Sequence, residues 1–423
     1  MASIILSFVG QQDPYSETTN EEGSILTLIK HLLSQNSQIR QTILLHSQTL
    51  TQNAIDTKEL LHDELGLDLG AIETIVVSDE LSKDPVNLYL AVQEARKGLE
   101  YAKPFLSKQD RLEFNASSGT PVMKNAWSIL QAAGYASHSY VWQVRNPKTM
   151  KAGQLRVFQT NVNALKNEFD FQVLERQIKN YNYSGALVTL ESSNLFTPLI
   201  KALLEYGNSR LAFDFNRAFK AIQPVANDVD RQLITQISQL RQKNQLALFK
   251  EVYFKAETKL KNQQYADFLI DVFRFQEGFL KYLVETKLGS QGVRLPKKSN
   301  QTKNFWEQVE KLEDGKLYEY IKRMNSDGAH PKGFPNRYNM AGILKYYQES
   351  PELLRDLEEL NDYCDARNRI VHNFEGISEL EDAAKILKTM RQILQQQVQV
   401  PKENPFNVLN QTISDLLRQS LHE

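Results

Sequence analysis

Several features that identify a protein at once are missing from this sequence, and each absence excludes a class of site. The chain has 423 residues and one cysteine, Cys364, so an internal disulfide and a cysteine-rich zinc site are excluded. Its seven histidines show no HExxH or similar metal-binding spacing. The net charge is −1, so no general basic excess indicates a nucleic-acid partner. Any contact with nucleic acid must therefore come from a local site.

Long hydrophobic runs are also absent. No stretch reaches the roughly 18 apolar residues that a membrane-spanning helix needs. The first ten residues, MASIILSFVG, lack the basic start of a signal peptide and predict a β-strand. A hydrophobic content of 41% and a charged content of 24% are typical of globular proteins, and the length predicts two or three domains. We therefore expect a cytoplasmic protein without a membrane partner.

The first 160 residues alternate between strand-like and helix-like patterns. Short apolar runs predict strands at 3–9, 42–45, 72–77, 111–115 and 139–144, with 155–158 pairing with the last as a hairpin. Helices are predicted between the strands, and Asp84 is the expected N-cap of one that runs through Tyr101. This alternation predicts an α/β domain with a mostly parallel, doubly wound, Rossmann-like sheet.

Strand signals end near residue 160, and the rest of the chain predicts helices. These are expected at 161–181, 195–206, 210–222, 228–262, 264–287, 340–348, 351–370, from a Ser378–Glu381 capping box through Gln397, and from Asn404-Pro405 onward. No internal repeat is evident. We place an α/β domain at 1–160, an all-α linker domain at 161–250 and an all-α C-terminal domain at 251–423.

The segment ARNRIVHN carries the most specific chemistry of the helical part. Apolar residues at 353, 357, 360, 364 and 371 share one helical face, and Arg367 extends that series. A guanidinium on an apolar stripe must be paired, or must line a cleft or an interface. Asn368 and His372 share a face, whereas Arg367 and His372 diverge by about 140° on a continuous helix. Their convergence needs an irregular turn or the same segment of a second subunit.

Arginine, asparagine and histidine together suffice to cut RNA without a metal. Arg367 can hold a phosphate through two hydrogen bonds and stabilise the charge that builds up on it. His372 can move protons near neutral pH, and Asn368 can orient either group. The 2′-hydroxyl would attack the adjacent phosphate and the 5′-oxygen would leave, which produces a 2′,3′-cyclic phosphate. Such a trio also arises by chance, so a purely structural role stays open at this point.

A second candidate site follows the predicted strand 111–115. The loop NASSGTPVMK offers three hydroxyls, a glycine that lets a ligand approach the backbone, and a lysine, at Ser117, Ser118, Thr120, Gly119 and Lys124. Pro121 begins a helix whose free N–H groups favour phosphate. This loop and the loop 10–16 lie at the carboxyl end of the sheet, where such folds bind ligands. The glycines of a P-loop or a dinucleotide fingerprint are missing, so a capped turn without a ligand is the alternative.

Both segments resemble motifs of known families. RNRIVHN resembles the R-polar-x3–5-H signature of HEPN-domain ribonucleases, which are all-helical and cut RNA as dimers. NASSGTPVMK resembles the strand-four motif of CARF domains, the Rossmann-like sensors of type III CRISPR systems. Their order, with helices between them, is similar to that of the CARF–HEPN ancillary ribonucleases of the Csm6 and Csx1 type.

The resemblance implies a homodimer whose paired CARF domains bind one ring of cyclic tetra- or hexa-adenylate, and no metal cofactor. The ring would activate a composite HEPN site of Arg367, Asn368 and His372 that cuts single-stranded RNA. Implied ring contacts are Ser117, Ser118, Gly119, Thr120 and Lys124, with Gln12 and Asp13 as weaker candidates. Two alternatives stay open: a nucleotide-sensing module without nuclease activity, and a CARF domain that degrades its own ligand.

Overall fold

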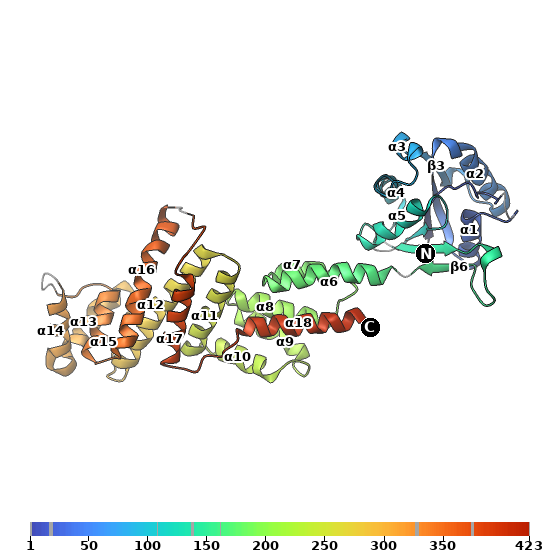
Figure 1. Ribbon diagram of the computed structural model, residues 1–423. Coiled ribbons are helices and arrows are strands. Elements are labelled where there is room, and N and C mark those ends of the chain that lie inside the picture. The colour runs from blue at the N-terminus through green and yellow to red at the C-terminus, as the bar shows by residue number, and fades with distance from the viewer. Residues whose placement is uncertain are drawn as a thin grey trace. The chain divides into compact units, whose positions relative to one another are not determined.

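The chain divides into two compact units. The computed structural model describes residues 2–16, 20–107, 109–136, 139–160, 162–325, 330–373 and 376–422, with the backbone alone at 163, 362, 364–373 and 422. The first unit comprises Met1–Val173 with Ser192–Leu195 and Leu421–Glu423, and the second comprises Leu174–Glu191 and Phe196–Ser420. Figure 1 shows the strands at the N-terminal end of the chain and helices after them. The predicted three-domain boundaries remain predictions.

The first unit is built on a six-stranded sheet of order β3-β2-β1-β4-β5-β6. Its strands are β1 (Ala2–Phe8), β2 (Gln38–His46), β3 (Ile72–Val76), β4 (Arg111–Asn115), β5 (Ser139–Val144) and β6 (Val157–Thr160). All neighbouring strands are parallel except β5 and β6, which are antiparallel. The predicted doubly wound sheet and the predicted hairpin are both confirmed.

Helices cover both faces of this sheet. They are α1 (Ser24–Ser34), α2 (Thr51–Leu65), α3 (Asp79–Lys83), α4 (Leu88–Ala102) and α5 (Pro121–Ala132). Side chains of the central strand β1 alternate between two apolar clusters, as the two-residue period of a strand requires. Leu6 and Phe8 pack in the cluster that α4 and α5 cover, whereas Ile5 and Val9 pack in the one that α1 and α2 cover. The central strand is therefore buried on both sides.

The prediction that Asp84 begins a helix was wrong. Asp84 instead follows the last residue of α3, and its backbone N–H bonds to the carbonyl of Glu80. The N-cap of α4 is Asn87, whose side chain accepts a hydrogen bond of 3.2 Å from the N–H of Leu90. Asp84 and Asn87 are both good capping residues. Because the short helix α3 comes first, the cap of the next helix moves three residues onward.

Helices make up the rest of the described chain. They are α6 (Asn163–Lys179), α7 (Tyr183–Glu191), α8 (Pro198–Leu211), α9 (Phe215–Ile222), α10 (Arg231–Arg241), α11 (Gln245–Lys261), α12 (Tyr265–Gly289), α13 (Thr302–Lys311), α14 (Lys316–Met324), α15 (Arg337–Tyr346), α16 (Pro351–Asn373), α17 (Ala383–Gln395) and α18 (Pro405–His422). Helices α7, α13 and α14 were not among the predicted segments. The predicted helical character of this region is confirmed.

Four junctions between consecutive helices use the same three-residue turn. The middle residue has a positive φ in each turn: 55° at Tyr181, 60° at Phe213, 57° at Lys243 and 56° at Gln263. Its N–H bonds to the carbonyl three residues earlier, and the next N–H bonds to the carbonyl five residues earlier. This is a Schellman ending, in which glycine is usual. None of the four turns has glycine at that position, so the sequence does not mark them as helix ends. The predicted single helix 228–262 was wrong for this reason: the chain turns at Lys243, between α10 and α11.

The predicted capping box at Ser378 and Glu381 was also wrong. Helix α17 begins after Asp382, whose side chain makes no capping hydrogen bond. The predicted start of the last helix is confirmed, because Oδ1 of Asn404 accepts a hydrogen bond of 2.9 Å from the N–H of Phe406. A capping motif in the sequence therefore does not by itself determine where a helix begins.

A buried ion pair joins α8 to α11 in the second unit. The Arg210 guanidinium donates from Nε to Oε1 of Glu251 at 2.6 Å and from Nη2 to Oε2 at 2.8 Å. Both side chains are 3% exposed. Arg210 also donates from Nη1 to Oη of Tyr206 at 2.7 Å and to Oε1 of Gln236 at 3.2 Å. The carboxylate and these two oxygens compensate a charge that burial alone would make costly.

We predict that removal of one partner destabilises this region strongly. Glu251→Gln leaves the buried guanidinium without a counter-charge and should lower the free energy of local opening by about 3–5 kcal/mol. Hydrogen exchange of peptides from α8 and α11 measures that quantity. The control is Lys201→Gln on α8, which breaks an exposed pair with Glu205 at 4.0 Å and should change it by less than about 1 kcal/mol. Unchanged exchange in Glu251→Gln would contradict a stabilising role.

Candidate functional site

A cavity of about 380 Å³ lies at the carboxyl edge of the sheet in the first unit. All seven residues predicted to contact a ligand line it: Gln12, Asp13, Ser117, Ser118, Gly119, Thr120 and Lys124. The parallel pairing of β1 with β4 places the ends of both strands, and so their loops, side by side. Sequence reasoning missed the lining residues contributed after β2, among them Ser47 and Thr49, because no local motif marks them.

Asp13 joins the two loops at the floor of the cavity and is 2% exposed. Its Oδ2 accepts a hydrogen bond from the hydroxyl of Ser118 and another, 3.0 Å long, from the N–H of Gly10. Its Oδ1 accepts a 3.4 Å hydrogen bond from the N–H of Ile25 in the first turn of α1. Its own carbonyl accepts from Nδ2 of Asn53 at 2.9 Å. Asp13 therefore holds the backbone that surrounds the cavity.

Burial raises the pKa of the Asp13 carboxyl above its ordinary value. Desolvation is the largest cause, and it is opposed by the hydrogen bonds from Ser118 and from the N–H groups of Gly10 and Ile25, and by the positive charge of Lys124. The carboxylate is thus ionised at neutral pH only at a cost, which these donors partly offset.

The hydroxyls of the β4 loop differ in what they can offer a ligand. Ser117 Oγ accepts a hydrogen bond of 2.6 Å from the N–H of Val144, so its own O–H remains able to donate. Thr120 is the N-cap of α5 and donates to the carbonyl of Pro85 at 2.7 Å. The N-terminus of α5 and the ammonium of Lys124 both favour an anion in the cavity.

Two glycines allow the loops to touch. A Cβ atom on Gly10 would lie 2.8 Å from the backbone nitrogen of Gly119, which is too close for any side chain. Gly119 has a φ of +87°, and a Cβ there would lie 3.1 Å from both Phe8 and Met123. Gly119 was predicted to let a ligand approach the backbone, but Gly10 was not predicted to have a role. The close approach of the loops supplies a reason for both.

Asn115, the last residue of β4, connects the segments that surround the cavity through hydrogen bonds. It is fully buried, and its Nδ2 donates to the hydroxyls of Ser7 at 3.0 Å and Ser24 at 3.1 Å. Its Oδ1 accepts from the N–H of Ser117 at 3.0 Å. It therefore connects β1, α1 and the β4 loop, a role that the sequence motif did not indicate.

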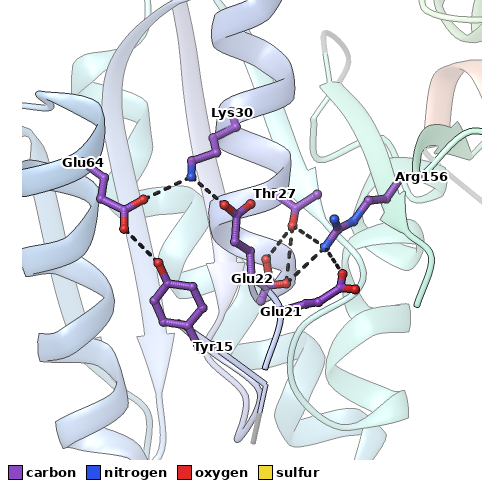
Figure 2. Close-up of polar contacts among 8 residues, drawn as sticks. Tyr15, Glu21, Glu22, Thr27, Lys30, Glu64 and Arg156 are labelled. Carbon is purple, nitrogen blue, oxygen red and sulfur yellow. Dashed lines mark hydrogen bonds and ion pairs between the residues drawn. The ribbon is translucent and has the colours of Figure 1, made fainter. Parts of the chain in front are cut away.

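A network of polar side chains holds Tyr15, Glu21 and Glu22, which belong to the loop between β1 and α1 (Figure 2). Lys30 on α1 bonds to Glu22 at 2.6 Å and to Glu64 on α2 at 3.1 Å. Glu64 also accepts a hydrogen bond of 2.8 Å from the hydroxyl of Tyr15. Arg156, just before β6, lies 3.3 Å from Glu21. Each exposed pair contributes little alone, but the set attaches the loop to three elements.

The motif predicted to cut RNA lies on α16. Arg367, Asn368 and His372 belong to this helix, but their side chains lie outside what the structure describes. Leu353, Leu357 and Leu360 are buried, which confirms the predicted apolar face for this part of the helix, whereas Cys364 and Val371 also lie outside the described side chains.

Described side chains do flank the motif on its N-terminal side. Oδ1 of Asn361 accepts hydrogen bonds from Nε2 of Gln276 at 2.8 Å and from Nη1 of Arg337 at 3.3 Å. The Arg337 guanidinium also lies over the ring of Phe273, 4.8 Å from its centroid. Sequence reasoning did not single out these residues, since they come from three separate helices.

Two kinds of feature are absent from the part of the chain that the structure describes. No group of three or more His, Cys, Asp or Glu side chains there could hold a metal ion. Among the same residues, no helix is both long enough and apolar enough to cross a membrane.

Comparison with known proteins finds a family model that matches the helical part and a solved structure with a similar fold. Residues 233–414 match the model of the Cas_Csm6 HEPN domain. The whole chain also matches the structure of Enterococcus italicus Csm6 bound to cyclic hexa-2'-fluoro-hexa-dAMP, with a TM-score of 0.69 at 15% identity, covering 98% of this chain and 100% of that one. The chain has the CARF–HEPN fold of Csm6. The resemblance to type III CRISPR CARF–HEPN proteins is thereby confirmed. A search among curated proteins finds no sequence match.

We predict that Asp13 makes the stability of the CARF unit depend on pH. Its folded-state pKa is raised, so its contribution is full below the unfolded pKa of about 3.9 and is lost as pH rises through the folded value. The unfolding free energy of the wild type minus that of Asp13→Asn should therefore fall from low to neutral pH and then level off.

Urea unfolding at a series of pH values, followed by the fluorescence of Trp127 and Trp142, measures this difference. A Trp306→Phe background removes the third tryptophan, which lies in the second unit. A difference that rises with pH would show that hydrogen bonding outweighs desolvation at Asp13.

Proposed function

We propose that this protein is an endoribonuclease that cyclic oligoadenylate switches on. One observation carries the proposal: residues 233–414, which match the Csm6 HEPN model, include the RNxxxH segment, in a chain with the fold of a Csm6 that binds a cyclic oligoadenylate analogue. The proposed activator site is the CARF cavity, and the proposed cleavage site is the motif on α16.

The CARF cavity fits part of such a ring. About 380 Å³ is near the lower end of the range for small-ligand pockets, so one cavity can hold only a part of a ring of four or six nucleotides. We infer that two copies of the chain pair and that each contributes one cavity. Ser117, Ser118, Gly119, Thr120 and Lys124 would contact the ring, with Gln12 at the rim. Asp13 would act by holding the loops, because its carboxylate is already bonded to Gly10, Ser118 and Ile25.

Cleavage would need only the three motif residues and the RNA itself. Arg367 would bind the scissile phosphate and stabilise the charge that develops on it. His372 would move protons as the 2′-oxygen attacks phosphorus and the bond to the 5′-oxygen breaks. Asn368 would orient them. The products are a 2′,3′-cyclic phosphate and a 5′-hydroxyl, and no step requires a metal.

A second copy also explains the spacing of the motif. The backbone of α16 is helical from Pro351 to Asn373, and positions five apart on a helix are separated by about 140°. Arg367 and His372 of one copy therefore occupy different faces of α16. A homodimer in which two α16 helices meet would bring arginine from one copy near histidine from the other.

We predict ligand-dependent cleavage that depends on the motif. A fluorescent single-stranded RNA should be cut in EDTA when cyclic tetra- or hexa-adenylate is added, and uncut without it. Arg367→Ala or His372→Ala should lower the rate by roughly 10²–10⁴-fold, because each removes phosphate stabilisation or proton transfer. The control is Arg355→Ala, an arginine of the same helix that is 75% exposed.

The outcomes separate the proposal from its alternatives. Full activity in either motif variant would contradict the assigned catalytic roles. Ring binding without RNA cleavage in the wild type would favour a sensing module. Loss of the ring in the His372→Ala protein would indicate a CARF domain that degrades its ligand.

We also predict that Lys124 acts on activator affinity rather than on catalysis. Lys124→Gln removes a charge-assisted hydrogen bond to phosphate and should raise the activator concentration for half-maximal cleavage by roughly ten- to a hundredfold. The rate at saturating activator should be unchanged. Lys97→Gln on α4, which alters a lysine that is 68% exposed, is the control. A lower saturated rate with unchanged half-maximal concentration would contradict this role.

A further inference from the structure

A short segment at the start of α15 combines exposed aromatic and basic side chains. It is HPKGFPNRY, residues 330–338, which ends with Arg337 and Tyr338, the first two residues of α15. Phe334 and Tyr338 are 50% and 51% exposed. Lys332 is exposed and Arg337 is partly exposed. Two exposed aromatic side chains next to two cations offer a ligand stacking surfaces and positive charge in one place.

The backbone of this segment is held in place although its side chains are exposed. Nε1 of Trp306 donates to the carbonyl of Gly333 at 2.9 Å. The hydroxyl of Tyr338 donates to the carbonyl of Met324, and Oδ1 of Asn336 caps α15 by accepting from the N–H of Asn339 at 2.8 Å. A ligand that stacks on these rings would therefore meet a fixed backbone and would cost little ordering of the chain.

The segment adjoins the motif helix through Arg337. The hydrogen bond from Arg337 reaches Asn361 on α16. Asn361 precedes Asn368 by seven residues and His372 by eleven, so all three positions lie on one helical face within an arc of about 40°, and the axial separations are about 10 and 16 Å. A chain of nucleotides that occupies the motif could thus continue along α16 onto this segment.

We propose that Lys332, Phe334, Arg337 and Tyr338 form a platform for single-stranded RNA that leads to the motif on α16. Bases stack on the two rings, and phosphates bind the ammonium and the guanidinium. Neither contact reads base identity, so the platform raises RNA affinity without sequence preference. The platform rests on the proposed ribonuclease function, because it names a further part of the same substrate's path.

The composition favours RNA over a second copy of the chain as the occupant. A two-fold interface places the same patch of both copies together, which would bring Lys332 and Arg337 of one copy near those of the other. Lysine is depleted in the centres of such interfaces. A polyanion neutralises the same charges and stacks on the same rings.

The test measures binding of a fluorescein-labelled single-stranded RNA of mixed sequence to the full chain carrying His372→Ala, by anisotropy across a salt series. Phe334→Ala should weaken binding by about tenfold with little change in the salt slope. Lys332→Gln should reduce the slope of log affinity against log salt by about 0.7, the value for one lost phosphate contact on a single strand. Phe196→Ala and Lys220→Gln, at exposed positions elsewhere in the second unit, should change neither.

Several results would overturn the platform. Unchanged affinity and slope in both variants would remove it. A shift of the dimer dissociation constant by sedimentation, without a change in RNA affinity, would assign the patch to a second copy.

Cleavage distinguishes the two proposals: with motif and activator intact, platform variants should raise KM and leave kcat unchanged. A wild type that binds RNA through the platform but never cuts it would contradict the proposed function alone.

Discussion

The CARF cavity depends on the parallel pairing of β1 with β4. Their register pairs Ser3 with Arg111 and Ser7 with Asn115, so the two strands end at the same edge of the sheet. Two polar loops that leave neighbouring strands must then share one space. Gly10 and Gly119 let their backbones touch, and the Asp13 carboxylate joins them by accepting from Gly10 and Ser118. A buried charge is costly unless donors surround it, and here those donors are the loops themselves. The charge and the shape of the cavity therefore depend on each other.

In the helical unit, the chain must reverse direction sharply between consecutive helices. Its recurring Schellman turn uses one residue with a positive φ and then, in three of four cases, an asparagine or aspartate that caps the next helix. Contacts far apart in sequence close the unit: the hydroxyl of Tyr183 donates to Asn410 on α18 at 2.6 Å. Because non-glycine residues occupy the strained turn positions, packing of the flanking helices must supply the free energy that the turns cost.

Sequence alone was sufficient for features with a local cause. The bounds of β4 and β5 follow from apolar runs that end at turn residues, and the residues singled out in the loop after β4 line the cavity. The prediction of an N-cap at Asp84 was wrong because α3, a five-residue helix, leaves only a weak periodic signal in the sequence. The interruption at Lys243 was not predicted because nothing in the local sequence favours a positive φ at a lysine. Asn115, Gly10 and the side chains after β2 matter through spatial neighbours from other strands, which a single sequence does not reveal.

Because the net charge is −1, the affinity of both proposed ligand sites must come from residues at the sites themselves. Long-range steering of a polyanion is weak when the protein has no overall positive field, so affinity must come from short-range contacts. The CARF cavity supplies one lysine, several hydroxyls and a helix N-terminus, and each of these groups acts only over a few ångströms. The segment 330–338 instead pairs its cations with aromatic rings, whose stacking on bases is insensitive to salt. If the two proposals hold, the activator site would discriminate by shape and hydrogen bonding, while the proposed RNA platform would accept many sequences.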